Sequence, residues 1–413
     1  MKPTTPIATD SERATETKVV GLVSAAHFVS HYYFNVLPPL FFLVRPEFGL
    51  SYTEIGMALM AFHVVSAVVQ TPAGFLVDRI SAKWSLIAGL ALGGGAFVVA
   101  GLVSNFYVFV AMFALAGIAN TVYHPAHYSI LSKRISPARM SHAFSVHVFA
   151  GYVGTAVSPA CQVLLAGWLG WRGAFVVAGA GGLAVAAALV LFGNSLSDPK
   201  TVRAKPAEPS RSVGWDILLS PAILLNVCFF MLISLGSAGV QAFGIVALQE
   251  LWGYPVGLAT TALSLYLGAA AFGVISGGFL AARTARQDLI AMAGMTLAAV
   301  AIIPVGLFDL GPALTLGLMG LSGFFTGLIT ASRDLLVQAV TPAGAFGAVF
   351  GYVTTGFAIG GILTPLVFGW FMDHGRPGGV FLATAFFGLL VLPLLLVGAQ
   401  LGKPVVKQPQ PAE

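Results

Sequence analysis

The chain has 413 residues, of which 57% are hydrophobic and only 8% are charged, with a formal net charge of +5. Soluble domains carry about 25% charged residues, and so few charges could not cover a water-exposed surface of this size. The composition therefore excludes a soluble globular protein and predicts an all-α integral membrane protein. Its basic balance, without a basic run interleaved with aromatic residues, favours anionic lipid headgroups over nucleic acid as a partner.

Twelve apolar stretches long enough to cross a bilayer follow a polar tail at residues 1–18. Six belong to a first bundle, residues 19–193, and six to a second bundle, residues 215–400. Residues 194–214 form a polar central loop, and residues 401–413 form a second tail. We expect spans near 19–44, 53–77, 84–104, 106–131, 142–168 and 173–193, then near 217–246, 256–281, 288–308, 313–338, 344–371 and 379–400.

Basic residues gather on one side of these expected spans. Of the 20 Lys and Arg residues, all but Arg45, Arg172 and Arg376 fall on one side, in the tails, in alternate loops or, for Arg333, late in the tenth span. Lys and Arg are retained on the cytoplasmic side of membranes. The pattern therefore predicts cytoplasmic N and C termini and a place in the inner or plasma membrane.

Two short segments recur in both halves of the chain. Residues 74–79 (GFLVDR) follow the second expected span, and residues 278–283 (GFLAAR) follow the eighth. Such repeats indicate duplicated six-helix units related by an axis along the membrane normal. The first copy resembles the signature of major facilitator transporters, in which it latches the cytoplasmic side shut; the alternative is a plain positive loop. The expected latch residues are Gly74, Asp78, Arg79, Lys83 and Arg283.

Glycine and proline recur in the fifth and eleventh spans in a pattern similar to the family's Gly/Pro motif. Small residues let helices cross closely, and proline frees a backbone carbonyl and allows bending. We expect these residues to pack helices rather than to contact substrate. They are Gly151, Gly154 and Pro159 in the fifth span and Gly356, Gly360 and Pro365 in the eleventh.

A narrower resemblance covers much of the first half. Residues 27–40 (HFVSHYYFNVLPPL) and 123–126 (YHPA) resemble the first and fourth helices of the fosmidomycin-resistance group of exporters. The resemblance implies the major facilitator fold and efflux of a drug or small organic solute. The chain departs from the group at His31 and Ala126, because the group tends to carry acids at about these positions.

Histidines are the unusual polar feature of the first half. His27 and His31 are four residues apart and His124 and His127 are three apart, so each pair shares a helix face. The family resemblance places the first and fourth helices beside the substrate cavity, where imidazoles could carry protons or bind an anion. The alternatives are helix packing and a divalent ion. We expect no metal, since no Cys or acid accompanies the pairs.

Arg333 in the tenth span is the second candidate for anion binding. Its planar guanidinium suits a carboxylate or phosphate, but it could equally pair with Asp334. By the expected spans, no carboxylate lies at mid-membrane. Further candidates for hydrogen bonds to substrate are Tyr32, Tyr33, Tyr128 and Gln241.

These features predict a monomeric secondary active transporter that moves a small organic anion or drug by alternating access. Efflux is favoured, with protons carried by histidines. The missing acids favour one alternative, an uncoupled facilitator or exchanger of an organic anion. The other is a membrane sensor that does not transport. Because no motif for catalysis, ATP or dinucleotide binding is present, we expect no enzyme activity and no cofactor.

Overall fold

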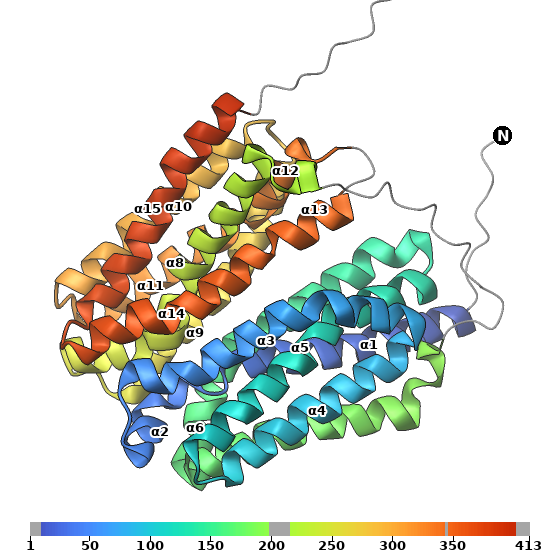
Figure 1. The fold of residues 1–413 in the computed structure, drawn as a ribbon, viewed down its shortest axis with the longest axis horizontal. Helices are drawn as coiled ribbons and strands as arrows, with labels where there is room; N and C mark the ends of the chain where they lie inside the picture. Colours follow the sequence, from blue (N-terminus) through green and yellow to red (C-terminus); the bar gives the residue numbers. More distant parts are fainter. Residues whose placement is uncertain (1–9, 198–214, 343–345, 402–413) are drawn as a thin grey trace, which may run out of the picture.

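The computed structural model describes residues 10–197, 215–342 and 346–401, and within them every regular element is a helix. Figure 1 shows two bundles, one of blue to green helices and one of yellow-green to red helices, which meet at one end and diverge toward the other. The all-α membrane fold with two six-span bundles, as predicted from the composition and the repeats, is confirmed.

The first bundle accounts for six spans, although its helices do not match them one to one. Two 3-10 turns, Tyr33–Asn35 and Pro38–Leu40, interrupt the first span, because Pro38 and Pro39 lack the N–H groups that continue a helix. The helices are α1 (Asp10–Tyr32), α2 (Phe41–Phe48), α3 (Tyr52–Arg79), α4 (Ala82–Leu102), α5 (Phe106–Arg134) and α6 (Pro137–Phe192), followed by the 3-10 turn η3 (Gly193–Leu196).

The long helix α6 folds back on itself and holds two predicted spans. Gly170 has φ 68° and ψ 168°, a conformation that breaks the helix and that glycine adopts readily. Arg134, just before α6, donates a hydrogen bond to the carbonyl of Ser195, just after it. The two ends of α6 therefore lie at the same end of the bundle.

The second bundle repeats this plan with different interruptions. The predicted tenth span breaks at Ile329 and the eleventh near Thr354. Its helices are α7 (Trp215–Leu218), α8 (Pro221–Trp252), α9 (Val256–Ala281), α10 (Gln287–Leu307), α11 (Gly311–Leu328), α12 (Thr330–Val340), α13 (Phe346–Val353), α14 (Thr355–Asp373) and α15 (Gly378–Leu401).

The expected number of spans is recovered from these helices. Ten stretches among the described residues are long and apolar enough to cross a membrane. One of them, Pro137–Leu196, is 60 residues long and contains two spans because of the break at Gly170. The interrupted first span completes the twelve.

The two ends of the molecule differ. At the closed end, where α3 begins and α8 and α14 end, the halves touch: a Cβ added to Gly56 would lie 2.4 Å from the Cβ of Pro365. At the open end, where α1 begins and α12 and α15 end, the bundles diverge (Figure 1). A cavity of about 670 Å³ lies there between α6 and α9, lined by residues that include Ser141, Tyr152 and Ile275.

Glycines set the distance between the helices that carry the polar residues. A Cβ on Gly154 of α6 would lie 2.3 Å from the carbonyl oxygen of Phe28 on α1. In the second half, a Cβ on Gly356 of α14 would lie 2.3 Å from the carbonyl oxygen of Val227 on α8. Each Gly/Pro motif therefore lies where two backbones nearly touch.

Candidate functional site

Five histidines from three helices form one cluster inside the first half. The ring of His27 stacks on that of His147 at a centroid distance of 3.9 Å. Its centroid lies 4.3 Å from His31, 5.1 Å from His127 and 5.3 Å from His124. The fold thus brings together the two pairs predicted on α1 and α5 and adds His147 from α6.

Three histidines of the cluster are buried, and most of its ring nitrogens lack hydrogen-bond partners. His27 is 4% exposed, and His127 and His147 are 0% exposed. Seven buried ring nitrogens of the five histidines have no hydrogen-bond partner among the described residues, including both nitrogens of His127 and of His147. Each unpaired buried polar atom costs about 1–3 kcal/mol, so this cluster is costly unless something binds to it.

One histidine has a defined orientation. The Nδ1 atom of His31 lies 3.1 Å from the hydroxyl oxygen of Thr155, and that hydroxyl lies 3.1 Å from the carbonyl oxygen of Gly151, to which it donates. Because the Thr155 proton is used on this carbonyl, its oxygen accepts from Nδ1–H of His31. The lone pair of His31 is then on Nε2, an atom without a hydrogen-bond partner in the cluster.

Gly151 makes the space in which the rings lie. A Cβ at this position would lie 2.6 Å from Nε2 of His27 and 3.2 Å from Cδ2 of His31. His147 precedes Gly151 by one helical turn and therefore shares its face of α6. His147 was not among the predicted site residues; its spacing from Gly151 shows that it shares the packing face of α6, but not that this face meets the other histidines.

The predicted tyrosines occupy different surroundings. The Tyr32 hydroxyl accepts a hydrogen bond from Nε2 of Gln162 at 3.0 Å, which ties α1 to α6. Tyr33 is 5% exposed and packs its ring 4.5 Å from Phe97, away from the histidines. Tyr128 is 44% exposed, and its ring centroid lies 6.1 Å from that of His147.

The two predicted candidates of the second half come from helices that contribute no histidine to this cluster. Gln241 is half-buried on α8. On α12, Arg333 donates from Nε to Oδ1 of Asp334 at 2.8 Å, and its guanidinium carbon lies 4.8 Å and 5.1 Å from the ring centroids of Phe230 and Phe357. Asp334 therefore already accepts from the guanidinium of Arg333, and an anion that bound there would compete with this carboxylate.

The predicted latch residues lie at the open end. The side chain of Asp78 lies outside the described residues. Arg79 and Arg283 are exposed, whereas Lys83 is buried, with Nζ 5.3 Å from the Trp84 ring. A Cβ on Gly74 would meet no atom within 4 Å, so Gly74 makes no close helix contact in this conformation. The latch stays a prediction for a conformation in which this end is shut.

Hydrogen bonds between the halves join described residues at the closed end, a region for which no contact was predicted. The carboxylate of Asp373 on α14 accepts from the backbone N–H of Tyr52 at 2.6 Å and of Thr53 at 2.9 Å. The Tyr52 hydroxyl donates to Glu250 on α8 at 2.6 Å. These four residues, Tyr52, Thr53, Glu250 and Asp373, form what we call the closed-end latch.

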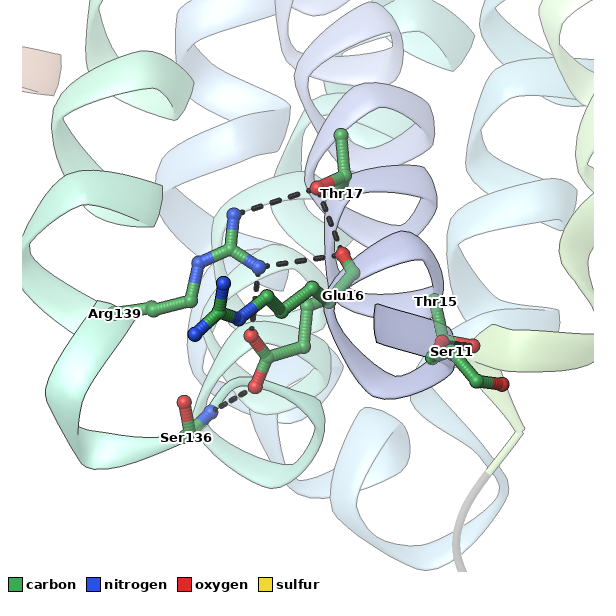
Figure 2. Close-up of polar contacts among 7 residues, drawn as sticks. Ser11, Thr15, Glu16, Thr17, Ser136 and Arg139 are labelled. Atoms are coloured by element: carbon green, nitrogen blue, oxygen red, sulfur yellow. Dashed lines mark hydrogen bonds and ion pairs between the residues drawn. The ribbon is translucent and has the colours of Figure 1, made fainter. Parts of the chain in front are cut away.

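At the open end, Glu16 and Arg139 make contacts within one half. Glu16 accepts from the backbone N–H of Ser136 at 2.7 Å and from Arg139 at 2.9 Å. Figure 2 shows Arg139 reaching from α6 to Glu16 and Thr17 on α1. Burial raises the pKa of Glu16, but the hydrogen bonds from Ser136 and Arg139 outweigh it and hold the pKa below its usual value.

Comparison with known proteins gives one consistent family. The sequence matches the family model of the Major Facilitator Superfamily over residues 23–319 and 242–413. It is 24% identical to the fosmidomycin resistance protein of Escherichia coli (strain K12), covering 93% of each chain. It is also 24% identical to the probable sulfoacetate transporter SauU of Cupriavidus necator, covering 94% of this chain and 92% of that protein.

A solved structure supports the fold. The chain superposes on a bacterial homolog of the human lysosomal transporter Spinster, in its inward-facing and occupied conformation, with a TM-score of 0.78. The match covers 95% of this chain and 98% of that one at 16% sequence identity. At this identity the likeness is one of fold alone.

Proposed function

Because this chain belongs to the Major Facilitator Superfamily, we propose that it is a secondary transporter that exports a small organic anion by alternating access. The observation that carries the proposal is that the two ends differ: the halves hold each other at the closed end, and a cavity lies between α6 and α9 at the open end. With both termini cytoplasmic, the open end faces the cytoplasm and can load a solute for export.

The polar residues between the ends suit an anion. The five clustered histidines present N–H donors, and Arg333 presents a guanidinium that can exchange Asp334 for a substrate oxygen. No carboxylate joins the ring contacts and the hydrogen bond described above for the cluster. Among the relatives, the probable transporter of sulfoacetate is named for an organic anion, which agrees with this substrate class.

The transport cycle follows from the contacts that must be exchanged. Opening the closed end breaks the hydrogen bonds from Tyr52 and Thr53 to Asp373 and separates Gly56 from Pro365. Closing the open end would form the contacts of the predicted latch, which includes Asp78 and Arg79. A bound anion shifts this balance by the difference between its affinities for the two states.

An uncoupled facilitator or exchanger is the second candidate, and one observation favours it. Asp334, the most interior acid of the predicted spans, is paired with Arg333 rather than free to relay protons. Measuring solute flux and proton flux together separates a proton-coupled transporter from an uncoupled one.

The test is solute-driven transport by the purified chain in proteoliposomes. The panel contains sulfoacetate, fosmidomycin, small mono- and dicarboxylates and a phosphate ester, with a pH-sensitive dye to follow protons. We expect the parent chain to transport one class of anion. Its transport rate should fall at least ~10-fold in Arg333→Ala. The rate should be unchanged in the control Arg376→Ala, which alters an exposed arginine at the closed end. Transport of none of these anions would contradict the proposal. Anion flux without proton movement would select the uncoupled form.

A further inference from the structure

Three of the clustered histidines converge on one point. One ring nitrogen from each of His27, His127 and His147 can be chosen so that the three atoms lie within 4.8 Å of one another. The residues come from α1, α5 and α6, so three helices hold the arrangement. All three side chains are buried, and His127 and His147 have no partner on either nitrogen among the described residues.

The chemistry of this donor set is specific. Three neutral imidazoles with free lone pairs are a known ligand set of Zn²⁺, and imidazole also suits Cu²⁺, Ni²⁺ and Co²⁺. Hard cations such as Mg²⁺ and Ca²⁺ prefer oxygen ligands, which the three side chains do not offer. Rings that only packed helices would be expected to hydrogen-bond to a hydroxyl or carbonyl, as His31 does to Thr155.

We propose that His27, His127 and His147 bind one divalent transition metal ion through one ring nitrogen each. Zn²⁺ bonds to imidazole nitrogen are about 2.0–2.1 Å, which places tetrahedral ligands about 3.4 Å apart. The three nitrogens now lie within 4.8 Å of one another, and the rings of His27 and His147 are stacked, so rotation of these rings is needed to turn their lone pairs toward one ion. Gly151 leaves the His27 ring free to make this rotation, because it has no side chain next to Nε2.

Three protein ligands leave a fourth position open on a tetrahedral ion. Since the ligands are neutral, the ion keeps its double positive charge, which an anionic ligand at the open position would offset. His31 and His124, which are only partly buried, lie next to the three. The nature of the anion rests on the proposed function: the carboxylate, sulfonate or phosphonate of the solute would be the fourth ligand.

The first experiment measures metal binding by the full-length chain in lipid nanodiscs, purified through a tag without histidine. After dialysis against Zn²⁺, we expect about one tightly held ion per chain by elemental analysis. With Co²⁺ we expect the visible absorption of a tetrahedral nitrogen site. His127→Gln and His147→Gln should each weaken binding at least ~10-fold. The matched control His142→Gln, an exposed histidine on the same helix as His147, should bind as the parent does.

The outcomes are decisive in both directions. Absence of tight binding by the parent, or equal binding by the parent and His127→Gln, would overturn the site. If the variants do not fold, the Co²⁺ spectrum of the parent decides instead, because thiolate ligation would indicate Cys161 or Cys228 and overturn the assignment. Transport is measured separately with and without a chelator. Anion transport by a chain that binds no metal would contradict the metal site and support the proposed function. Metal binding without anion transport would support the metal site and contradict the proposed function.

Discussion

The closed and open ends of this molecule use their polar residues differently. At the closed end, Asp373 of the second half accepts from Tyr52 and Thr53 of the first. At the open end, the ion pairs Glu16–Arg139 and Arg286–Asp288 each join residues of one half. Contacts within a half can persist while the halves move, but contacts between halves cannot. In the proposed cycle, the contacts within a half would hold each bundle rigid, and the contacts between halves would be exchanged during transport.

The largest effect is expected where the halves touch without polar groups. Gly56→Ala places a Cβ 2.4 Å from that of Pro365 and forces the closed end apart. Overpacking costs about 1–3 kcal/mol, equivalent to a 5–150-fold shift away from the closed arrangement. Initial rates of solute uptake, with the labelling rate of a single cysteine at the closed end, measure the shift.

Gly95→Ala is the control for that substitution, because a Cβ at Gly95 of α4 would meet no atom within 4 Å. Unchanged transport in both variants would mean that the contact between Gly56 and Pro365 does not take part in the cycle.

A smaller effect is expected from Asp373→Ala, which removes the carboxylate that caps α3 from the other half. Loss of a cap costs about 1 kcal/mol, so the closed arrangement should lose roughly fivefold in population. The control is Asp309→Ala, since Asp309 accepts from the backbone N–H of Gly311 within the second half. We expect that control to lower thermal stability without changing cysteine labelling. Equal labelling changes in both variants would argue against a special role for a cap shared between halves.

The smallest effect is expected from Glu16→Gln at the open end. The lowered pKa of Glu16 means that its carboxylate stabilises the fold above the unfolded pKa of about 4.3, and that this contribution is lost as pH falls through the lower folded pKa. At pH 7 the parent should therefore melt a few degrees higher than the variant, and the gap should close at acid pH, as followed by thermal unfolding. Cysteine labelling at the closed end should stay unchanged, and a change there would show that this contact also responds to the state of the halves.

Local patterns carried much of the fold and part of the site. Hydrophobic length gave the twelve spans, and helical spacing gave the two histidine pairs. His147 was missed because only the packing of α6 on α1, through Gly151 and Gly154, brings it to the cluster. The closed-end latch was missed because Tyr52 and Asp373 are 321 residues apart, and no local pattern links a carboxylate to a helix start at that distance.

The two possible partners of Arg333 could not be ranked from the sequence, because both depend on side-chain direction. In the structure the guanidinium pairs with Asp334 and lies near Phe230 and Phe357. The rings come from α8 and α14, so their distance from Arg333 is set by helix packing rather than by chain neighbours. No metal was expected because no Cys or acid accompanies the two histidine pairs, and the proposed third ligand, His147, comes from a third helix that no short motif links to them.

The cap that Asp373 provides for α3 makes opening the closed end a hydration step. When the halves separate, the N–H groups of Tyr52 and Thr53 lose the carboxylate, and bulk water must take its place. Water activity outside the membrane therefore enters the equilibrium between the two states. Excluded osmolytes such as sucrose favour the less hydrated arrangement, so osmotic stress on that side should slow the opening of this transporter even when the solute gradient is unchanged.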